Sequence, residues 1–164
     1  MTYYVFVENE KINGKGQARI LNENILNIEV KEEVYSNIEK YIYQDGQIVL
    51  DPDYEEKQAQ KERERIGQLY LTGADVERGI FKARGADFED IINMIGQMQI
   101  NSDPRTEGIE LKALKIELKA NHFYRGNPYI DAVGTLLGFT SEQLDRFFET
   151  GDYTALLDIP RENV

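Results

Sequence analysis

The chain has no cysteine and only one histidine, His122, among its 164 residues. The absence of cysteine excludes disulfides, cysteine-ligated zinc sites and thiol nucleophiles, and it suits a reducing compartment. No apolar run is long enough to span a membrane, and the acidic residue Glu8 follows the first apolar residues too early for a signal peptide. We therefore expect a soluble protein with no membrane partner, no metal and no other cofactor.

Positive charge is also scarce. The sequence contains 19 Lys and Arg residues against 30 Asp and Glu residues, which gives a formal net charge of −11. The acidic excess is spread over the front and back parts of the chain, and no basic block offsets it. A nucleic acid or an anionic membrane would be repelled at long range. We therefore expect no nucleic-acid partner.

A polar stretch from residue 51 to residue 70 separates two regions of different pattern. Asp51-Pro52-Asp53 is typical of a helix start, and the residues between Tyr54 and Ile66 are nearly all polar helix formers. Such a helix is solvated over most of its length. The sequence therefore predicts an α+β chain in three parts: a small antiparallel β module at residues 1–50, a connecting charged helix at 51–70 and a helical bundle at 71–160.

Turn residues punctuate the predicted β module. Thr2 to Glu8 carries aromatic and β-branched residues on both faces, which predicts a strand covered on two sides. Asn13-Gly14 predicts a turn after which Gln17 to Leu21 returns as the hairpin partner. Asp45-Gly46 between two alternating apolar runs is the strongest local signal, and it predicts a tight hairpin. Further elements are predicted as a strand at Ile25–Val30 and a short helix within Lys31–Lys40.

Fifty residues of sheet supply little core of their own. We therefore expect the β module to complete its burial against something else, and a second subunit is one option.

Capping signals divide the back half into about five helices. Thr72 and Asp87 are predicted N-caps, Thr140 with Gln143 is a predicted capping box, and Gly85 is a predicted helix end. Gln99 to Gly108 is predicted as a loop. One central helix is predicted from Glu110 to Phe123 with its end at Gly126, and Pro160 is predicted to close the ordered chain.

Residues 130–148 have the spacing of a helix-turn-helix. Small and apolar residues occupy the positions around its turn. The would-be recognition helix, however, presents Glu142 and Asp145 with only Arg146 positive, whereas phosphate contacts need Lys or Arg. The pattern favours a packing hairpin, and a DNA-binding regulator that uses residues 130–148 remains the alternative function.

No catalytic, cofactor-binding or metal-binding residue is predicted. His122 has no partner at metal-ligand spacing and no nucleophile to activate, and we expect it at a helix end, where it interacts with the terminal carbonyl groups. The acidic groups Asp51/Asp53 and Asp87/Glu89/Asp90 are typical of solvated helix starts. A hydrolase built on acids and His122 is the weaker option, so we expect a protein that is not an enzyme.

Two aromatic segments are candidates for contact with a protein partner. Residues 121–129 combine Tyr, Arg and His at a corner between helices, and residues 3–6 form an aromatic strand. Such residue types are enriched at interfaces, but Tyr and Arg could equally lock the corner from within. The candidate contact residues are Tyr3, Tyr4, Phe6, His122, Tyr124, Arg125 and Asn127.

Several segments resemble parts of small uncharacterised proteins of bacterial phages and prophages, a group associated with tail genes. These segments are residues 2–6, 22–30, 41–49, 71–79 and 123–127. More loosely, a Tyr-rich hairpin with Asp-Gly followed by Asp-Pro-Asp-Tyr and a charged helix is similar to tail-fibre and tail-fibre-assembly proteins.

The resemblance implies a non-enzymatic structural or assembly protein that acts by protein–protein contact, and it supplies no catalytic residues. Its implied partner is a tail component or a second copy of the chain. Its implied location is the bacterial host cytoplasm during assembly, with the virion as a further option.

Overall fold

A computed structural model describes residues 1–157, and it has the predicted α+β class with 51% helix and 20% strand. The chain forms two compact units, Met1–Lys61 (unit 1) and Glu62–Val164 (unit 2), with the division inside helix α2 (Tyr54–Gly67). The predicted bundle end at residue 160 and the predicted role of Pro160 lie outside the described residues. Within the described residues, no helix is both long and apolar enough to cross a membrane.

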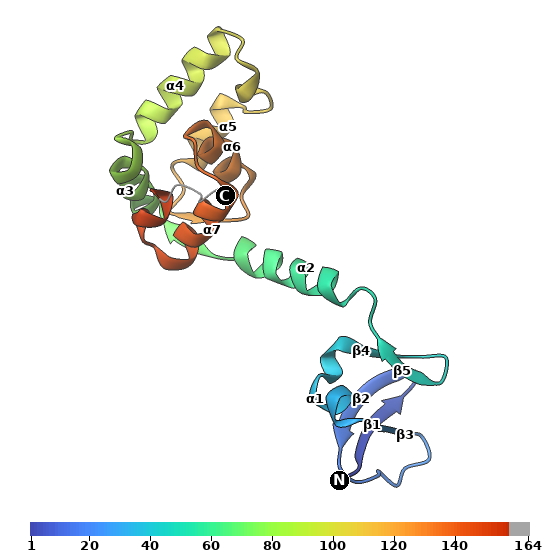
Figure 1. Cartoon of the computed structure of the whole chain (residues 1–164). Coiled ribbons are helices and arrows are strands. Elements are labelled where there is room, and N and C mark those ends of the chain that lie inside the picture. The colour runs from blue at the N-terminus through green and yellow to red at the C-terminus, as the bar shows by residue number, and fades with distance from the viewer. Residues whose placement is uncertain (158–164) are drawn as a thin grey trace, which may run out of the picture. The chain divides into compact units, whose positions relative to one another are not determined.

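Unit 1 is built around the predicted first strand, β1 (Tyr3–Glu8). This strand is the centre of a three-stranded antiparallel sheet in the order β2-β1-β3, with β2 at Lys11–Gly16 and β3 at Leu26–Val30 (Figure 1). Val5 and Val7 are buried on one face of the sheet. The other elements are α1 (Glu32–Ser36), a 3-10 helix (Ile38–Lys40), β4 (Tyr41–Gln44) and β5 (Gln47–Leu50).

The predicted turn at Asn13-Gly14 is wrong, because those residues lie inside β2. The chain reverses at Asn9-Glu10, whose φ angles are 50° and 60°. The glycines of β2 instead make room for a ring: a Cβ atom at Gly16 would lie 2.8 Å from Cζ of Phe6. The predicted strand at Gln17–Leu21 does not form either; this segment is held beside β3 by its backbone, since the Ile20 N–H donates to Oδ1 of Asn27 at 2.7 Å.

The predicted hairpin at Asp45-Gly46 is confirmed. Strands β4 and β5 pair antiparallel with Tyr43 opposite Ile48, and the turn residues Asp45 and Gly46 have φ angles of 51° and 85°. Two consecutive residues with positive φ define the turn type whose twist matches the flanking strands. The predicted helix within Lys31–Lys40 is present as α1 and the short 3-10 helix that follows it.

Helix α2 is shorter than its predicted range of 51–70. Its start is fixed by Asp51, whose Oδ1 accepts a hydrogen bond from the Asp53 N–H at 3.0 Å and whose Oδ2 lies 2.8 Å from Nζ of Lys57. None of the residues of α2 is buried, in keeping with its polar sequence. The helix ends at Gly67, and Tyr70 lies in a strand.

Unit 2 contains the predicted bundle with its predicted caps. The side chains of Thr72, Asp87 and Thr140 accept backbone hydrogen bonds at helix starts, and Gly85 ends its helix with a φ angle of 72°. The helices are α3 (Gly73–Arg84), α4 (Phe88–Ile100), α5 (Leu111–Glu117), α6 (Pro128–Leu136) and α7 (Ser141–Thr150), with 3-10 turns at Pro104–Thr106 and Tyr153–Leu156.

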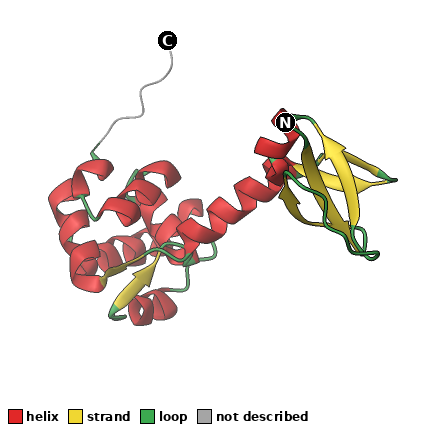
Figure 2. Ribbon diagram, turned by 90° about the horizontal axis from the view of Figure 1, so that it is seen from below, coloured by secondary structure: helices red, strands yellow, loops and turns green. Residues whose placement is uncertain are grey.

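The expectation of an all-helical back half is wrong, because two strands pair inside it. Strand β6 (Tyr70–Thr72) lies antiparallel to β7 (His122–Tyr124), with Leu71 opposite Phe123. The predicted helix at Glu110–Phe123 accordingly ends at Glu117, and Gly126 does not end it. Phe123 is 3% exposed and packs in the core, so burial and strand pairing outweigh the local helix preference. Figure 2 shows this ribbon in yellow among the red helices.

One hydrophobic core fills unit 2. Two helix glycines allow its closest approaches: a Cβ atom at Gly134 would lie 2.6 Å from Cδ1 of Leu144, and one at Gly79 would overlap the ring of Phe147. The buried hydrophobic residues of this core are Val76, Ile80, Ile91, Ile95, Ile109, Leu114, Phe123, Val133, Phe139, Leu144, Phe147, Phe148, Ala155 and Leu156.

Candidate functional site

The β6–β7 ribbon has one buried face and one exposed aromatic face. Alternate residues of a strand point to opposite sides, so Leu71 and Phe123 enter the core while Tyr70, His122 and Tyr124 face outward. Tyr70 is 56% exposed and Tyr124 is 50% exposed. The Tyr70 ring lies 5.7 Å from that of Tyr124 and 5.3 Å from that of His122, measured between centroids. We call these three residues the aromatic face.

The predicted place of His122 at a helix end is wrong, since it lies in β7. There its side chain is exposed and packs edge-on to Tyr70. His122 and Tyr124, two of the predicted contact residues, are therefore brought together on one surface. Tyr70 completes that surface and was not predicted.

An open hollow of about 570 Å³ adjoins the aromatic face at Tyr124. Its base is formed where two glycines meet: the Gly126 N–H donates to the Gly67 carbonyl at 3.1 Å, and a Cβ atom at Gly126 would lie 3.0 Å from that oxygen. A larger residue at position 126 would force the two backbones apart. We call this the acidic hollow; the residues that line it are Glu64, Gly67, Gln68, Glu117, Tyr124, Gly126, Asn127, Pro128 and Tyr129.

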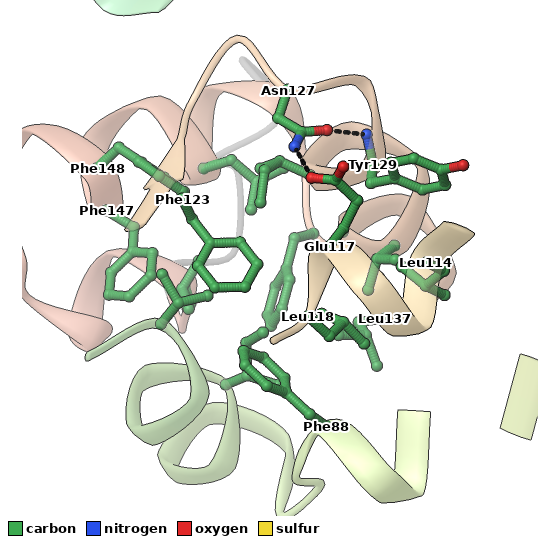
Figure 3. Close-up of a pocket in the computed structure, with 18 residues that line it drawn as sticks. Phe88, Leu114, Glu117, Leu118, Phe123, Asn127, Tyr129, Leu137, Phe147 and Phe148 are labelled. Carbon is green, nitrogen blue, oxygen red and sulfur yellow. Dashed lines mark hydrogen bonds between the residues drawn. The ribbon is translucent and has the colours of Figure 1, made fainter. Parts of the chain in front are cut away.

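Asn127 organises the rim of the acidic hollow. Its Oδ1 accepts from the Tyr129 N–H at 3.0 Å, which caps α6, and its Nδ2 donates to Oε2 of Glu117 at 2.7 Å (Figure 3). Both halves of the amide are thus used within the chain. Asn127 therefore positions Glu117 and the start of α6 from within the chain.

Arg125 is buried, which corrects its prediction as a contact residue. Its side chain is 6% exposed, and its Nε donates to Oδ1 of Asp145 at 2.6 Å while Nη2 donates to Oγ of Ser141 at 2.6 Å. Nη2 also lies 2.9 Å from Oδ1 of Asp131. Burial opposes the charge, but the hydrogen bonds and charges of Asp131 and Asp145 outweigh it and raise the pKa of Arg125. The alternative interpretation, in which Arg locks the corner from within, fits this geometry.

The other three candidates, Tyr3, Tyr4 and Phe6, belong to unit 1 and are half-buried there. The Tyr3 ring lies 4.7 Å from that of Tyr35, and the Arg19 guanidinium lies 5.3 Å from the Tyr4 ring. Together with the contact of Phe6 on Gly16, these neighbours cover both faces of β1 in part. Each ring already has a partner inside unit 1.

The core of unit 2 encloses a cavity of about 30 Å³, drawn in Figure 3. Its lining is almost entirely apolar and includes the rings of Phe88, Phe123 and Phe147. A cavity of about 150 Å³ is needed to hold a benzene-sized molecule. This space is therefore a packing gap in the core, too small for an organic substrate.

The acidic groups predicted at solvated helix starts do lie at helix starts, but Asp51 is buried, which corrects its predicted exposure. Asp87 and Asp90 form a capping box at the start of α4, and Asp51 lies at the start of α2. Within residues 1–157, no three His, Cys, Asp or Glu side chains are grouped so that they could hold a metal ion.

The predicted helix-turn-helix segment folds as α6, a turn at Gly138 and α7. The exposed residues of α7 are Ser141, Glu142, Glu149 and Thr150. Among the described residues of this helix, therefore, the exposed ones include no cation. Asp145 is paired with the buried Arg125. A phosphate backbone would meet negative charge on this helix, which weighs against the DNA-binding alternative.

Sequence reasoning missed Tyr70, Glu64 and Glu117 as members of a site. Tyr70-Leu71-Thr72 does have the aromatic and β-branched composition of a strand. Its partner strand is distant in sequence, however, and no local pattern links the two. Comparisons with protein-family models, with curated proteins and with solved structures find no match to this chain.

Proposed function

We propose that this chain is a non-enzymatic protein that acts by protein–protein contact, as a tail-associated structural or assembly factor of a phage or prophage. The aromatic face carries the contact part of this proposal. Tyr70 and Tyr124 are each at least half exposed on a ribbon whose opposite face is anchored in the core. Large exposed rings on a rigid element are the residues that most often supply the binding energy of protein interfaces.

The absence of a built reaction centre supports the same proposal. In the part of the chain that the structure describes, the enclosed cavity is too small for a substrate, and the carboxylates of Asp51, Asp87 and Asp90 are used at helix starts. The sole histidine packs on a tyrosine ring. The tail-associated part of the proposal rests on the resemblance of residues 2–6, 22–30, 41–49, 71–79 and 123–127 to phage and prophage proteins.

Co-expression with tail proteins tests the proposal. The chain would be purified together with each tail protein encoded beside its gene, and complexes would be sized by light scattering. We expect one of them to form a stoichiometric complex. Replacing both tyrosines (Tyr70→Thr with Tyr124→Thr) is expected to weaken that complex by about tenfold or more, because tyrosines that become buried on binding are typical interface anchors. Threonine keeps the strand preference of both positions.

A matched control removes an exposed ring elsewhere in unit 2. Phe81 on α3 is 57% exposed and lies outside the aromatic face, so Phe81→Ala should leave the complex unchanged. A strictly monomeric chain that binds none of the tail proteins would contradict the proposed function. Equal weakening by Phe81→Ala would instead contradict the assignment to the aromatic face.

The DNA-binding alternative has its own test. We expect no shift of duplex DNA in a mobility-shift assay at low salt, where electrostatic binding is strongest. A mobility shift that is abolished by Arg146→Ala would contradict the proposed function and favour a regulatory one.

A further inference from the structure

The acidic hollow has the chemistry of a site for a cation. Two of its lining residues are glutamates, Glu64 and Glu117, and a third is the half-exposed ring of Tyr124. None of its lining residues is Lys, Arg or His. Carboxylates attract a cation by charge, and the face of a tyrosine ring attracts it through the ring quadrupole.

Glu117 is held in place without being neutralised. Its Oε2 accepts a hydrogen bond from the Asn127 amide, which is uncharged, and it forms no ion pair with any residue that the structure describes. Two arginines of unit 2 are engaged with other carboxylates: Arg125 is enclosed by Asp131 and Asp145, and Arg65 is paired with Glu62 and Glu149. The negative charge at the rim is therefore fixed and available.

Among the described residues, no cation lies over Tyr70 or Tyr124 of the aromatic face. Four cations of the described part lie over aromatic rings, at distances of 4.3 to 5.3 Å from the centroids. Their rings are those of Tyr35, Tyr4, Tyr153 and Phe139, and not those of Tyr70 or Tyr124. Both rings are at least half exposed, so a cation supplied from outside can reach them.

The space is also shaped for a side chain. The base of the hollow is the contact of Gly67 with Gly126, where the chain has no side-chain atoms to fill it. Its volume of about 570 Å³ is open to solvent. An extended Lys or Arg side chain can lay its apolar stem along Pro128 and Tyr129 and place its charged head at Glu117.

We propose that the acidic hollow receives a lysine or arginine side chain from a basic segment of the partner protein. This inference rests on the proposed function and adds the chemistry of the partner. The net charge of −11 argues for a different, basic protein rather than a second copy, because two copies of this chain repel each other at long range. The aromatic face supplies the contact area beside the hollow.

The test uses the full chain, labelled with ¹⁵N, and three short synthetic peptides that differ only in their charged residue: lysine, arginine or glutamate. Backbone amide shifts would be followed by NMR at millimolar peptide. We expect the lysine and arginine peptides to move the amides of Glu117, Tyr124 and Gly126, and the glutamate peptide to move none of them. The basic peptide that binds with the higher affinity identifies the preferred side chain.

Charge removal within the hollow provides the matched variants. Glu64→Gln with Glu117→Gln removes two charges, and the amide oxygen introduced by Glu117→Gln can still accept the hydrogen bond of Asn127. We expect this pair of substitutions to lower the affinity for the basic peptides by about tenfold, as the loss of two partly exposed ion contacts implies. The control Glu89→Gln with Glu107→Gln removes the same charge at two exposed positions outside the hollow, and it should change affinity less than about twofold.

Three outcomes would overturn the inference: shifts that spread evenly over the acidic surface, shifts of equal size with the glutamate peptide, or equal weakening by both variant pairs. A complex between two copies that is lost on Glu64→Gln with Glu117→Gln would overturn it too, because the occupant would then be a second copy. If a tail protein binds the chain but the basic peptides do not map to the hollow, the proposed function stands and this inference fails.

Discussion

Arg125 is the residue on which the corner between β7 and α7 depends. Its guanidinium satisfies Asp131, Asp145 and Ser141 together from a buried position. Removal of one partner from a buried ion pair is costly, because it leaves polar groups unmatched. We expect Arg125→Met to lower the free energy of unfolding by about 2–4 kcal/mol, measured by urea denaturation. Arg125→Lys should fall between Arg125→Met and the parent, since it keeps the charge but not the planar fork.

The control is an exposed arginine with a similar pairing. Arg105 lies 2.6 Å from Asp103 but is 68% exposed, and exposed pairs contribute little. Arg105→Met should change the free energy of unfolding by about 0.5 kcal/mol or less. Equal effects at Arg125 and Arg105 would contradict the structural role given to Arg125.

Gly79 on α3 allows close packing in the core because its side chain is only a hydrogen atom. A Cβ atom there would overlap the Phe147 ring. We expect Gly79→Ala to destabilise the protein by about 1–3 kcal/mol through overpacking, despite the better helix preference of alanine.

Gly96 on α4 is the matched comparison for Gly79, because its nearest neighbour would be Cδ2 of Leu111 at an ordinary 3.6 Å. There the same change should stabilise by about 0.5–1 kcal/mol, since only the backbone entropy of glycine is removed. Thermal unfolding of the two variants would show opposite shifts. Shifts in the same direction would refute the close contact of Gly79 with Phe147.

At the scale of single elements, α7 is specified by its capping box. The Thr140 hydroxyl accepts from the Gln143 N–H at 3.2 Å, and the Gln143 side-chain oxygen accepts from the Thr140 N–H at 2.8 Å. We expect Thr140→Ala to cost about 1 kcal/mol of stability, the usual value of a lost N-cap. Thr135 lies exposed within α6, so Thr135→Ala should be neutral or slightly stabilising in the same urea titration.

Elements with a local chemical signal were predictable from the sequence. Asp45-Gly46 adopts the two positive φ angles that the pair favours, and Asp87 and Thr140 cap helices as their spacing indicates. The turn at Asn9-Glu10 was missed because Asn13-Gly14 offered a stronger turn signal nearby. That glycine serves the packing of Phe6 instead, and a contact between neighbouring strands leaves no mark in a local window.

The candidate site was only half predictable for a related reason. His122 and Tyr124 could be singled out by their residue type, but their place on a strand depends on pairing with Tyr70 and Thr72. The burial of Arg125 could not be predicted, because arginine is favoured both in buried ion pairs and at protein interfaces. Its burial is decided by Asp131, Ser141 and Asp145, which come from two different helices.

At the scale of the whole molecule, the two units differ in how much core they possess. Val5 and Val7 are the buried hydrophobic residues of unit 1, whereas the core of unit 2 involves residues from helices α3 to α7 and from the β6–β7 ribbon. Stability grows with the apolar surface removed from water. We expect unit 1 to unfold at lower urea than unit 2, which residue-resolved NMR of the intact chain would detect as two separate transitions.

Coincident loss of signals from both units would contradict that expectation. An internal reference is available in each unit, because Val5 and Leu114 are both fully buried. The amides of Val5 and Leu114 would report the two midpoints in a single titration.

The pairing of β6 with β7 also has a consequence for the order of events on the ribosome. Leu71 is synthesised well before Phe123, the residue opposite it, and α3, α4 and α5 leave the exit tunnel in between. A nascent chain that has emerged only as far as the end of α5 has these helices but no second strand to close the ribbon. Tyr70 and Tyr124 therefore meet only after all three helices have emerged, so the aromatic face is completed late in translation, and the partner proposed above could dock there only from that point.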